Sequence, residues 1–407
     1  MVADKIHCLD FSTEVLTLDG WKTVHQITKN DYIATLKDEK LVYEKPINIM
    51  IYNDYEGSMY YIKNSSIDFA VTGNHRMWVS KNDIEIYNFE RADEIIGKYR
   101  KYKKNAIWDK ADYQFTLSGE PRNIEMKDWL TFFGIWYSEG CVSGTKGTVT
   151  ISVNKQRVKD NLFSILENFV NYKYDKEQEK VHIYDYQLYR YMEPLSVGAE
   201  NKKLPNWVFE LSSEQTKILI NCMLLGDGSK NKKTDCEFYY TISVELANQF
   251  QQLCLHAGWA GTISVAGNES IIDGRKVISN YDTLRISVIK TRLYPSVNHG
   301  HVSKQNAQEE KYIENEKCPV FCLQVPSEVF YVRRNGKCAW TANSRAQGQV
   351  TTLCRQPLEG RSIRSQWYCK ILLVYGIVGN IFKLREHLIM SLILTYFGNT
   401  IRVLVNY

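Results

Sequence analysis

Short runs of strand-forming hydrophobic residues recur over the first eighty positions of the chain. Residues 14–24, EVLTLDGWKTV, place such residues on both sides of Asp19-Gly20, a dipeptide that favours a tight hairpin turn. Similar runs, SMYYI, DFAVT and RMWVS, follow as far as residue 80, and the turn-forming pair Gly73-Asn74 separates the last two. We predict an all-β module for this part of the chain.

The middle of the chain has a different pattern, with apolar helical stretches at residues 130–137 and 218–225. A segment that predicts a strand followed by an amphipathic helix occurs twice, as GTVTISVNKQRVKDNLFSILENF and FYYTISVELANQFQQLCLHAG. Aligning Ile151 with Ile242 gives an offset of 91 residues, and the two preceding helix ends, Glu139 and Asp227, are 88 residues apart. These near-equal offsets predict a duplicated α/β unit.

Strand pattern returns at residues 320–340, where Asn335-Gly336 predicts another hairpin turn. The β-module is therefore expected to be split around an α/β insertion. The final stretch, residues 363–407, is rich in Ile, Leu, Val and Tyr, but charged residues at 383, 385 and 386 interrupt it too early for a membrane span. We expect no membrane association.

Composition adds modest constraints. A chain of 407 residues with 44% hydrophobic and 24% charged residues is expected to fold into at least two modules. The net charge of +5 permits nucleic-acid binding without arguing for it. The ten cysteines form no regular framework and no secretory signal opens the chain, so we expect reduced thiols in the cytosol or nucleus. Cys318 and Cys322 are interpreted as strand residues rather than zinc ligands.

Three short motifs carry candidate chemistry: CLDFSTEVLTLDGWKTV from Cys8, VTGNH ending at His75, and WTANS containing Asn343. Taken alone, each residue has a plain structural explanation, as a buried thiol, a strand-end histidine and a turn residue. Taken together, in this order and spacing, the motifs resemble the conserved blocks of an intein, a protein element that excises itself from its host. The resemblance implies an all-β splicing domain.

The resemblance also implies a role for each residue. The thiol of Cys8 would attack the carbonyl of His7 to form a thioester, because a thiolate is the effective nucleophile. Thr72 and His75 would hold the oxyanion and protonate the leaving amide nitrogen. The Ser344 hydroxyl would then take over the upstream segment as an ester. Cyclisation of the Asn343 side chain would cut the Asn343–Ser344 bond.

Two positions depart from the intein pattern. Many inteins have a histidine before the terminal asparagine, where this chain has Ala342. Lost general-acid assistance at that step would cost about 10²–10⁴ in rate, or roughly 3–5 kcal/mol. The late β-block often has an aspartate where FCLQV has Cys322. A thiol there could act as an acid, and a packing role is an equal alternative.

The flanks give an independent expectation. Removing residues 8–343 joins MVADKIH to SRAQGQVTTLCRQPLEGRS, which reads without a gap as a segment similar to the second-largest subunit of DNA-directed RNA polymerase II. The similarity ends at about residue 362. It implies that the host is a transcription enzyme of the nucleus, and that the element acts there.

Two apolar stretches, LTFFGIWYSEG and LINCMLLGDG, resemble the paired LAGLIDADG motifs of homing endonucleases. A single helix that ends at glycine is common for backbone reasons. Two helices packed along small residues such as Gly134 and Ser138 would bring Glu139 and Asp227 side by side, and paired carboxylates bind hard divalent cations. The resemblance implies Mg²⁺ at these two residues, Lys203 assisting the attacking water, and cleavage of double-stranded DNA at the intein-free allele of the host gene. For Lys203, a solvated surface lysine is a nearly equal alternative.

One further segment, YRKYKK, interleaves aromatic and cationic residues. It fits either DNA-backbone contacts or a solvated run of charge.

The expected fold class is an all-β horseshoe splicing (Hint) domain, split by an inserted α/β pseudo-twofold LAGLIDADG endonuclease domain, and a monomer is expected after excision. Two alternatives stay open: a splicing-impaired intein that retains only endonuclease activity, and a non-functional fragment of an RNA polymerase subunit. The expected boundaries are an upstream polymerase flank at 1–7, a splicing domain at 8–110 and 312–343, a homing endonuclease at 111–311, a downstream polymerase flank at 344–362, and a tail of unknown nature at 363–407.

Overall fold

The computed structural model describes residues 6–81, 85–117, 124–143, 147–167, 170–272, 275–300, 307–343, 392–397 and 400–405. The chain divides into two compact units, Met1–Arg345 and Ala346–Tyr407. In the second unit the described residues form one antiparallel hairpin of β23 (Leu392–Phe397) and β24 (Thr400–Val405). Among the described residues, no helix is long and apolar enough to cross a membrane.

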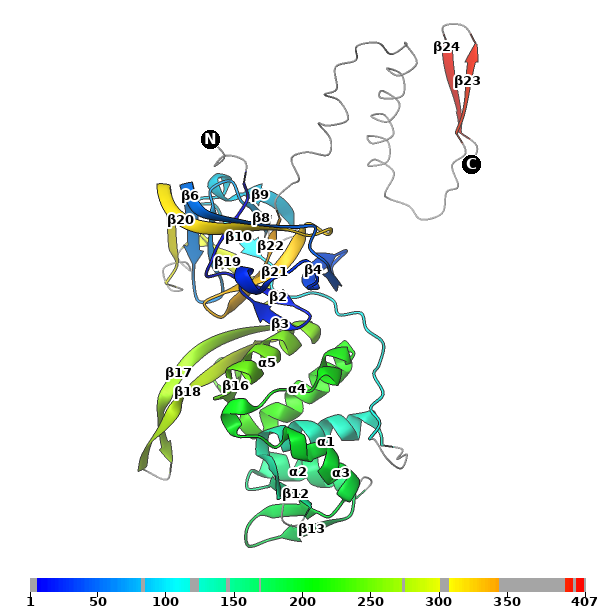
Figure 1. Ribbon diagram of the computed structural model, residues 1–407, viewed down its shortest axis with the longest axis vertical. Coiled ribbons are helices and arrows are strands. Elements are labelled where there is room, and N and C mark those ends of the chain that lie inside the picture. The colour runs from blue at the N-terminus through cyan, green and yellow to red at the C-terminus, as the bar shows by residue number, and fades with distance from the viewer. Residues whose placement is uncertain are drawn as a thin grey trace. The chain divides into compact units, whose positions relative to one another are not determined.

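The first and last parts of the larger unit are built from strands. Four of them close into a barrel in the order β1-β20-β6-β7 (Figure 1). The barrel strands are β1 (Leu9–Asp10), β6 (Asn48–Lys63), β7 (Asp68–Thr72) and β20 (Glu309–Gln324), and the strands that surround them are β2 (Glu14–Thr17), β3 (Gly20–Lys22), β4 (Ile33–Lys37), β5 (Lys40–Glu44), β8 (Arg76–Ser80), β9 (Asn88–Arg91), β10 (Arg100–Tyr102), β19 (Ser296–Val297), β21 (Val329–Arg334) and β22 (Lys337–Ala342). The all-β module expected from the pattern is therefore present.

Both predicted hairpin turns form. Gly20, with φ of +103°, begins β3 opposite β2. Asn335 and Gly336 have φ of 47° and 74°, the left-handed pair that a two-residue hairpin requires. A Cβ on Gly336 would lie 2.2 Å from the main-chain oxygen of Ile263. Glycine is therefore required twice at this position, by its own dihedral angle and by the strand that passes over it.

The middle of the chain contains the same supersecondary unit twice. In each half a helix, two strands, a second helix and two more strands follow one another, and each four-stranded group has the same order, β11-β12-β14-β13 and β15-β16-β18-β17. The first half comprises α1 (Met126–Glu139), β11 (Gly140–Ser143), β12 (Thr148–Ser152), α2 (Gln156–Leu166), β13 (Tyr172–Asp175), β14 (Lys180–Ile183) and α3 (Tyr186–Met192); the second comprises α4 (Ser213–Asp227), β15 (Gly228–Lys230), β16 (Glu237–Thr241), α5 (Val244–His256), β17 (Ala260–Ile272) and β18 (Arg275–Ile289). This repeated order confirms the predicted duplication.

The register corrects one part of that prediction. Gly140 pairs with Ile151, and Gly228 pairs with Tyr239. The position in the second half that is equivalent to Ile151 is therefore Tyr239, 88 residues later, and not Ile242. The second helices also begin 88 residues apart. The offset of 91 residues was wrong because it matched the letters TIS across the end of β16.

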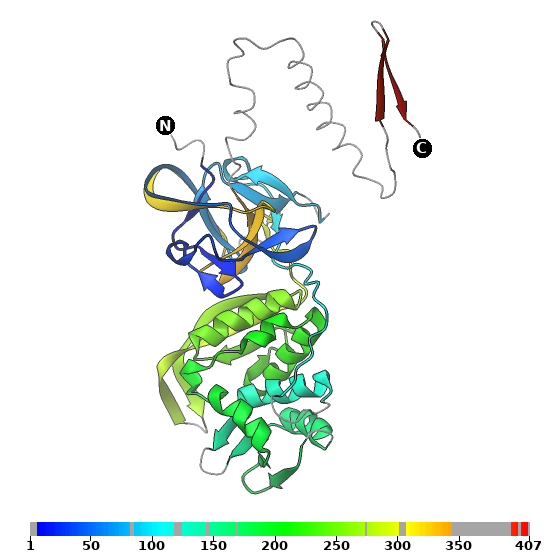
Figure 2. The same ribbon diagram turned by 45° about the vertical axis from the view of Figure 1, so that its right-hand side comes forward.

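The two parts of the larger unit are joined through strand and helix contacts. β17 pairs with β22 at Thr262 and Lys337, which continues one sheet from the α/β half into the β-rich part. Arg333 donates hydrogen bonds to Gln251 of α5 and to Glu14 of β2. Figure 2 shows α5 beside the long β17–β18 ribbon. The chain is back in the β-rich part at β19, because β19 pairs with β10. The expected boundary at residue 312 lies later, inside β20.

The segment YRKYKK turns out to be part of this joint. Arg100 forms a 2.7 Å ion pair with Glu90 and is mostly buried. Lys104 is fully buried and donates to the Thr262 hydroxyl at 3.2 Å, and burial lowers its pKa to about 8. Neither a DNA contact nor a solvated charge run describes the segment.

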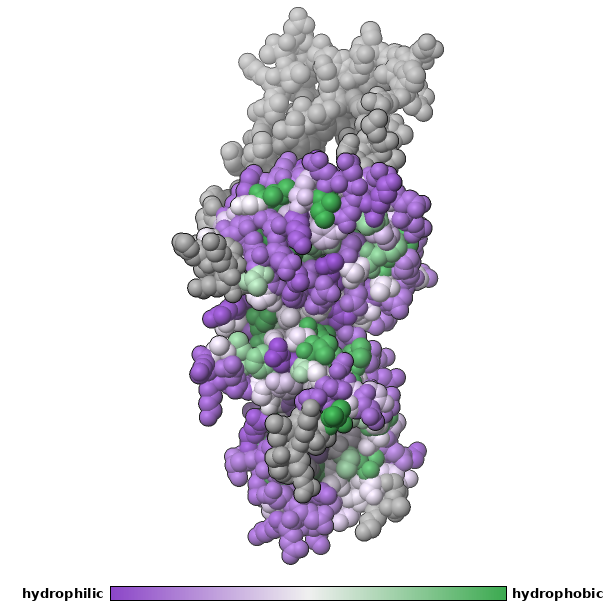
Figure 3. Space-filling view, turned by 90° about the vertical axis from the view of Figure 1, so that its left-hand side faces the viewer, coloured by the Kyte–Doolittle hydropathy of each residue, from purple (hydrophilic) through white to green (hydrophobic). Residues whose placement is uncertain are grey.

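On the face drawn in Figure 3 the surface is mainly hydrophilic, with hydrophobic residues in small separate groups.

Candidate functional site

Cys8 and Thr72 lie together because β1 pairs with β7 through Leu9 and Val71. The amide of Cys8 donates to the Thr72 hydroxyl at 3.0 Å, and the amide of Thr72 donates to the Cys8 carbonyl at 3.0 Å. The Thr72 hydroxyl is also 3.1 Å from the carbonyl oxygen of Ile6. Thr72 thus holds the main chain on both sides of the expected upstream junction.

His75 follows at the end of the same turn and is buried. Its Nε2 lies 2.8 Å from the hydroxyl of Thr341, two residues before Asn343. Burial is the main cause that lowers the pKa of His75 to about 3, and the charge of His7 lowers it further, while a backbone hydrogen bond with His7 acts in the opposite direction. His75 is therefore a neutral imidazole near pH 7, close to the backbone of the residue whose carbonyl would be attacked.

Asn343 is held at the end of β22 by main-chain groups. Its amide donates to the Glu328 carbonyl at 2.8 Å, and its side-chain Nδ2 donates to the Val325 carbonyl at 2.7 Å. Its Oδ1 is buried and has no hydrogen-bond partner within the described ranges. Ala342 is also fully buried. Ser344, the expected second nucleophile, lies outside the described residues.

The largest departure from expectation concerns Cys8 and Cys322, which form a disulfide. β1 and β20 pair through Leu9 and Phe321, so the two cysteines are the next opposed pair in the register. Free thiols were expected because the cysteines form no regular framework and no secretory signal was found, and the separation of 314 residues gives no local sign of this pairing. In this state neither sulfur can act as a nucleophile or as an acid.

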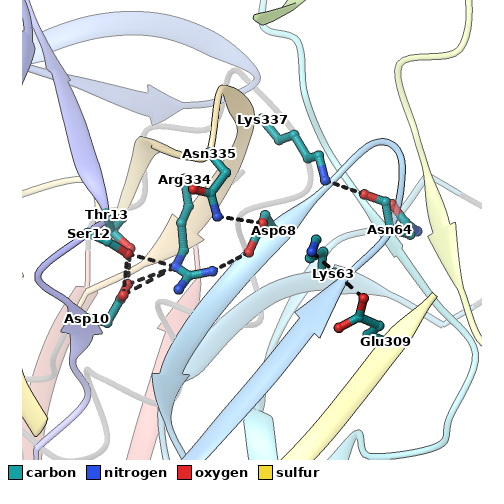
Figure 4. Close-up of polar contacts among 10 residues, drawn as sticks. All are labelled: Asp10, Ser12, Thr13, Lys63, Asn64, Asp68, Glu309, Arg334, Asn335 and Lys337. Atoms are coloured by element: carbon teal, nitrogen blue, oxygen red, sulfur yellow. Dashed lines mark hydrogen bonds and ion pairs between the residues drawn. The ribbon is translucent and has the colours of Figure 1, made fainter. Parts of the chain in front are cut away.

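An ionic network around the buried Asp68 supports the same strands (Figure 4). Arg334 contacts Asp10 at 3.2 Å and Asp68 at 2.6 Å, and Asn335 donates to Asp68 at 3.0 Å. Asp10 lies on β1, two residues after Cys8, and Asp68 begins the strand that ends at Thr72. Arg334 ends β21, just before the turn into the strand that leads to Asn343. Sequence reasoning missed this network, whose sequence signals are the aspartate two residues after Cys8 and the arginine before the turn.

The two apolar helices of the α/β part pack closely through small residues. A Cβ on Gly134 would lie 2.7 Å from Cys222, and a Cβ on Gly226 would lie 3.0 Å from Cγ of Glu139. The Ser138 hydroxyl donates to the carbonyl of Met223 at 2.9 Å. This close crossing brings the C-terminal ends of α1 and α4 together, so that Glu139 lies against the residue that precedes Asp227.

The electrostatic surroundings of the two acids differ. Lys155 forms a 2.6 Å ion pair with Glu139 and donates to the Gly226 carbonyl at 2.8 Å. Burial is the main cause that raises the pKa of Asp227 to about 6; the positive charge of Lys202 opposes this, the negative charge of Glu139 adds to it, and Lys155 opposes it. Glu139 is therefore balanced by an ion pair, whereas the Asp227 carboxyl loses its proton only near pH 6.

The lysines near this site differ from those expected. Lys202 donates to the carbonyl of Tyr137 at 2.8 Å and acts on Asp227. Lys203 contributes its main-chain carbonyl to the hydroxyl of Tyr137. Lys155 was missed, although it occupies the turn between β12 and α2. The role of Lys203 as the basic residue stays a prediction.

No group of three or more His, Cys, Asp or Glu residues that could hold a metal ion occurs within the described part of the chain. Two carboxylates are nevertheless a donor set suited to Mg²⁺, which keeps several waters and shares its coordination with substrate phosphates. No hydrogen bond contributes to the electrostatic surroundings of the partly buried Asp227 carboxylate among the described residues, so its oxygens are not committed to another group. The pair fits such an ion.

No family model matches the chain. It is 37% identical to the C-terminal section of a DNA-directed RNA polymerase β subunit from Stigeoclonium helveticum over 421 residues, which covers 89% of this chain and 38% of the relative. It is 29% identical to an ATP-dependent Clp protease proteolytic subunit from Chlamydomonas moewusii, over 88% of this chain and 47% of the relative.

Two solved structures are similar to the chain. One is a splice-inactive variant of the AceL NrdHF class 3 split intein, with a TM-score of 0.28, 11% identity, and coverage of 83% of this chain and 99% of that chain. The other is the N-terminal LAGLIDADG domain of DUF199/WhiA, with a TM-score of 0.24, 12% identity, and coverage of 42% and 77%. The chain thus matches an RNA polymerase subunit and a protease subunit over nearly all of its own length, and spans less than half of either.

Proposed function

We propose that residues 8–343 are an intein that cuts itself out of its host, and that its inserted α/β part is a LAGLIDADG homing endonuclease. The observation that carries the proposal is that both ends of this segment contact one pair of buried residues, Thr72 and His75. Cys8 exchanges two hydrogen bonds with Thr72, and His75 contacts Thr341 next to the downstream junction. One site can therefore serve the chemistry of both junctions.

The sequence relatives support a transferable insertion. An RNA polymerase subunit and a protease subunit share no activity by name, yet this chain is similar to each over 89% and 88% of its own length. A segment common to two proteins with different named activities is not expected to carry out either of them. An element that leaves its host intact after excision accounts for that distribution.

In the proposed first step the Cys8 thiol, when reduced, transfers its proton to the neutral imidazole of His75. The thiolate forms a bond to the His7 carbonyl carbon, and the His7–Cys8 amide bond breaks. His75 then returns the proton to the departing nitrogen, which Thr72 holds through its hydroxyl. His75 starts neutral, so it has a free position for the proton, and its lowered pKa makes the imidazolium that forms a strong acid toward the departing nitrogen.

In the proposed last step the Asn343 amide nitrogen closes on its own carbonyl carbon and releases Ser344. The hydrogen bond from Nδ2 to Val325 orients this amide. Ala342 supplies no proton, which favours slow downstream cleavage and keeps open the alternative that the element splices poorly and mainly cuts DNA. Ser344 and Cys322 keep their proposed roles as second nucleophile and auxiliary acid in the reduced protein.

We further propose that Glu139 and Asp227 hold Mg²⁺, and that the substrate is double-stranded DNA at the intein-free allele of the host gene. When bound, the ion lowers the pKa of a coordinated water and stabilises the leaving oxygen of a phosphodiester. The two carboxylates supply ligand oxygens, Lys155 limits the charge repulsion between them, and Lys203 is the proposed basic residue for the water. The polymerase-like flanks support a nuclear host, and the excised element is proposed to act as a monomer.

Two single substitutions test the splicing proposal in reduced protein. Cys8→Ala should abolish release of residues 1–7 and leave cleavage after Asn343 measurable. Asn343→Ala should abolish downstream cleavage and leave a thioester at Cys8 that hydroxylamine can trap. Unchanged cleavage in either variant, read as intact masses, would remove that residue from the mechanism.

A further inference from the structure

The proposed nucleophile, Cys8, is joined to Cys322 on the neighbouring strand. We propose that this disulfide is an oxidative modification site that blocks splicing until a small dithiol reduces it. The inference rests on the proposed splicing function, since it assigns a redox state to the residue that begins the reaction.

The backbone alone favours the pair. Cys8 and Cys322 extend the antiparallel register of Leu9 with Phe321, and their Cα atoms are 4.5 Å apart. This distance is that of the closely spaced kind of cross-strand pair, and it lies within the range that a disulfide spans without backbone movement. Under oxidising conditions the two sulfurs can therefore form the bond without a change in the strand register.

The environment of the disulfide limits which reductants reach it. Cys8 and Cys322 are 0% and 1% exposed, inside a small apolar cluster that also contains Ile6, Met59 and Val320. A bulky protein reductant would need the strands to open first. A small dithiol also needs an opening, because both sulfurs are buried, but the opening that it needs is the smallest.

The pairing is also selective. Six other cysteines in the described part of the chain are free thiols, including the exposed Cys141 and Cys236. Cys318 packs against the same cluster, but burial, with the charges of Glu316 and Asp10, raises its pKa to about 11. Since a thiol exchanges through its thiolate, Cys318 is a poor competitor for either sulfur.

The reaction balances as a two-electron exchange. One thiolate of the dithiol attacks a sulfur of the Cys8–Cys322 bond and releases the other cysteine as a thiolate, which leaves a mixed disulfide. The second thiol of the reductant then attacks its own sulfur in this mixed disulfide and releases the remaining cysteine. The reductant leaves as its own disulfide, and its two protons end on Cys8 and Cys322. Only then does Cys8 carry the thiol that attacks His7.

The test uses the full chain produced in cells with an oxidising cytoplasm and purified without reductant. Peptide mapping reads the Cys8–Cys322 link, and hydroxylamine-trapped release of residues 1–7 reads the thioester. A phosphine reductant is added to half of each sample, because a phosphine reduces disulfides without cleaving thioesters as a thiol would. The variants are Cys322→Ser, which cannot form the link, and Cys318→Ser as the matched control on the same strand.

The proposal expects at least a tenfold increase in release on reduction for the native chain and for Cys318→Ser. Cys322→Ser should release residues 1–7 equally with and without reductant. If the mapped link is absent, or if native samples release residues 1–7 equally with and without reductant, the proposed oxidative block is overturned and the splicing proposal is not. If the link forms and is reduced, and no sample releases residues 1–7, both the proposed oxidative block and the proposed splicing reaction fail.

Discussion

The ammonium group of Lys155 lies 2.6 Å from the Glu139 carboxylate and also donates to the carbonyl of Gly226, the residue before Asp227. A single side chain from the turn between β12 and α2 thus bridges the ends of both apolar helices. The residue 88 positions later is Ser243, which caps α5 instead, so the two halves of the site are not equivalent.

Replacing Lys155 with methionine should lower DNA cleavage about 10²-fold, because Glu139 would lose its ion pair and Asp227 would keep only Lys202 as a positive charge that opposes the repulsion between the two acids. The measurement is double-strand cleavage of an intein-free host gene segment in Mg²⁺. Lys232→Met, an exposed lysine with no described side-chain partner, is the matched control and should cleave normally. Glu139→Gln should be inactive, and equal cleavage by that variant would contradict the assignment of the acid pair.

Cleavage should also rise with pH through about 6, where the Asp227 carboxyl loses its proton, and level off above pH 7. The sign follows from the raised pKa, because only the carboxylate form binds a cation. Lys202→Met should move the midpoint upward, since Lys202 is the positive charge that opposes the shift most strongly. A flat rate between pH 5 and 8 would show that Asp227 does not limit the reaction.

Acid should destabilise the protein through His75 and His256, the two histidines that are buried in the described part of the chain. Burial lowers the pKa of both His75 and His256 to about 3, well below the ordinary value, so the unfolded chain binds more protons between pH 6.5 and 3 and stability is lost as the pH falls through that window. Each histidine should cost about 2 kcal/mol between pH 7.5 and 5. Urea unfolding at the two pH values measures this loss.

His256→Gln should remove about half of that pH-dependent loss, whatever it does to absolute stability, because only the contribution of His75 would remain. The exposed His25→Gln is the control and should keep the full difference. An unchanged pH difference in His256→Gln would contradict a neutral, buried His256.

Arg334 should matter for both stability and upstream cleavage. Arg334→Ala leaves the buried Asp68 without its ion pair, which should cost about 3–5 kcal/mol of unfolding free energy. Because Arg334 also contacts Asp10, two residues after Cys8, hydroxylamine-trapped release of residues 1–7 should slow about tenfold in the reduced protein. Arg190→Ala, at an exposed position on α3, is the control. Normal release from a folded Arg334→Ala protein would assign the network to stability alone.

The sequence predicts features that depend on local pattern. The Asn335-Gly336 turn and the two helices that end in Glu139 and Asp227 follow from dihedral preference and periodicity within a few residues. The Cys8–Cys322 disulfide and the ion pair of Lys155 with Glu139 could not be found in this way, because they depend on the register between distant strands and on which turn faces which helix end. The misaligned Ile151 shows the same limit, since matching letters do not fix a strand register.

The mass of the chain after incubation tests the central claim most directly. Fully reduced protein, held at neutral pH and analysed by intact mass spectrometry, should yield a product of 336 residues that begins at Cys8 and ends at a cyclised Asn343, together with a peptide in which His7 is joined to Ser344. A single intact mass for residues 1–407 at every time point, with the Cys8–Cys322 bond verified as reduced, would contradict the account.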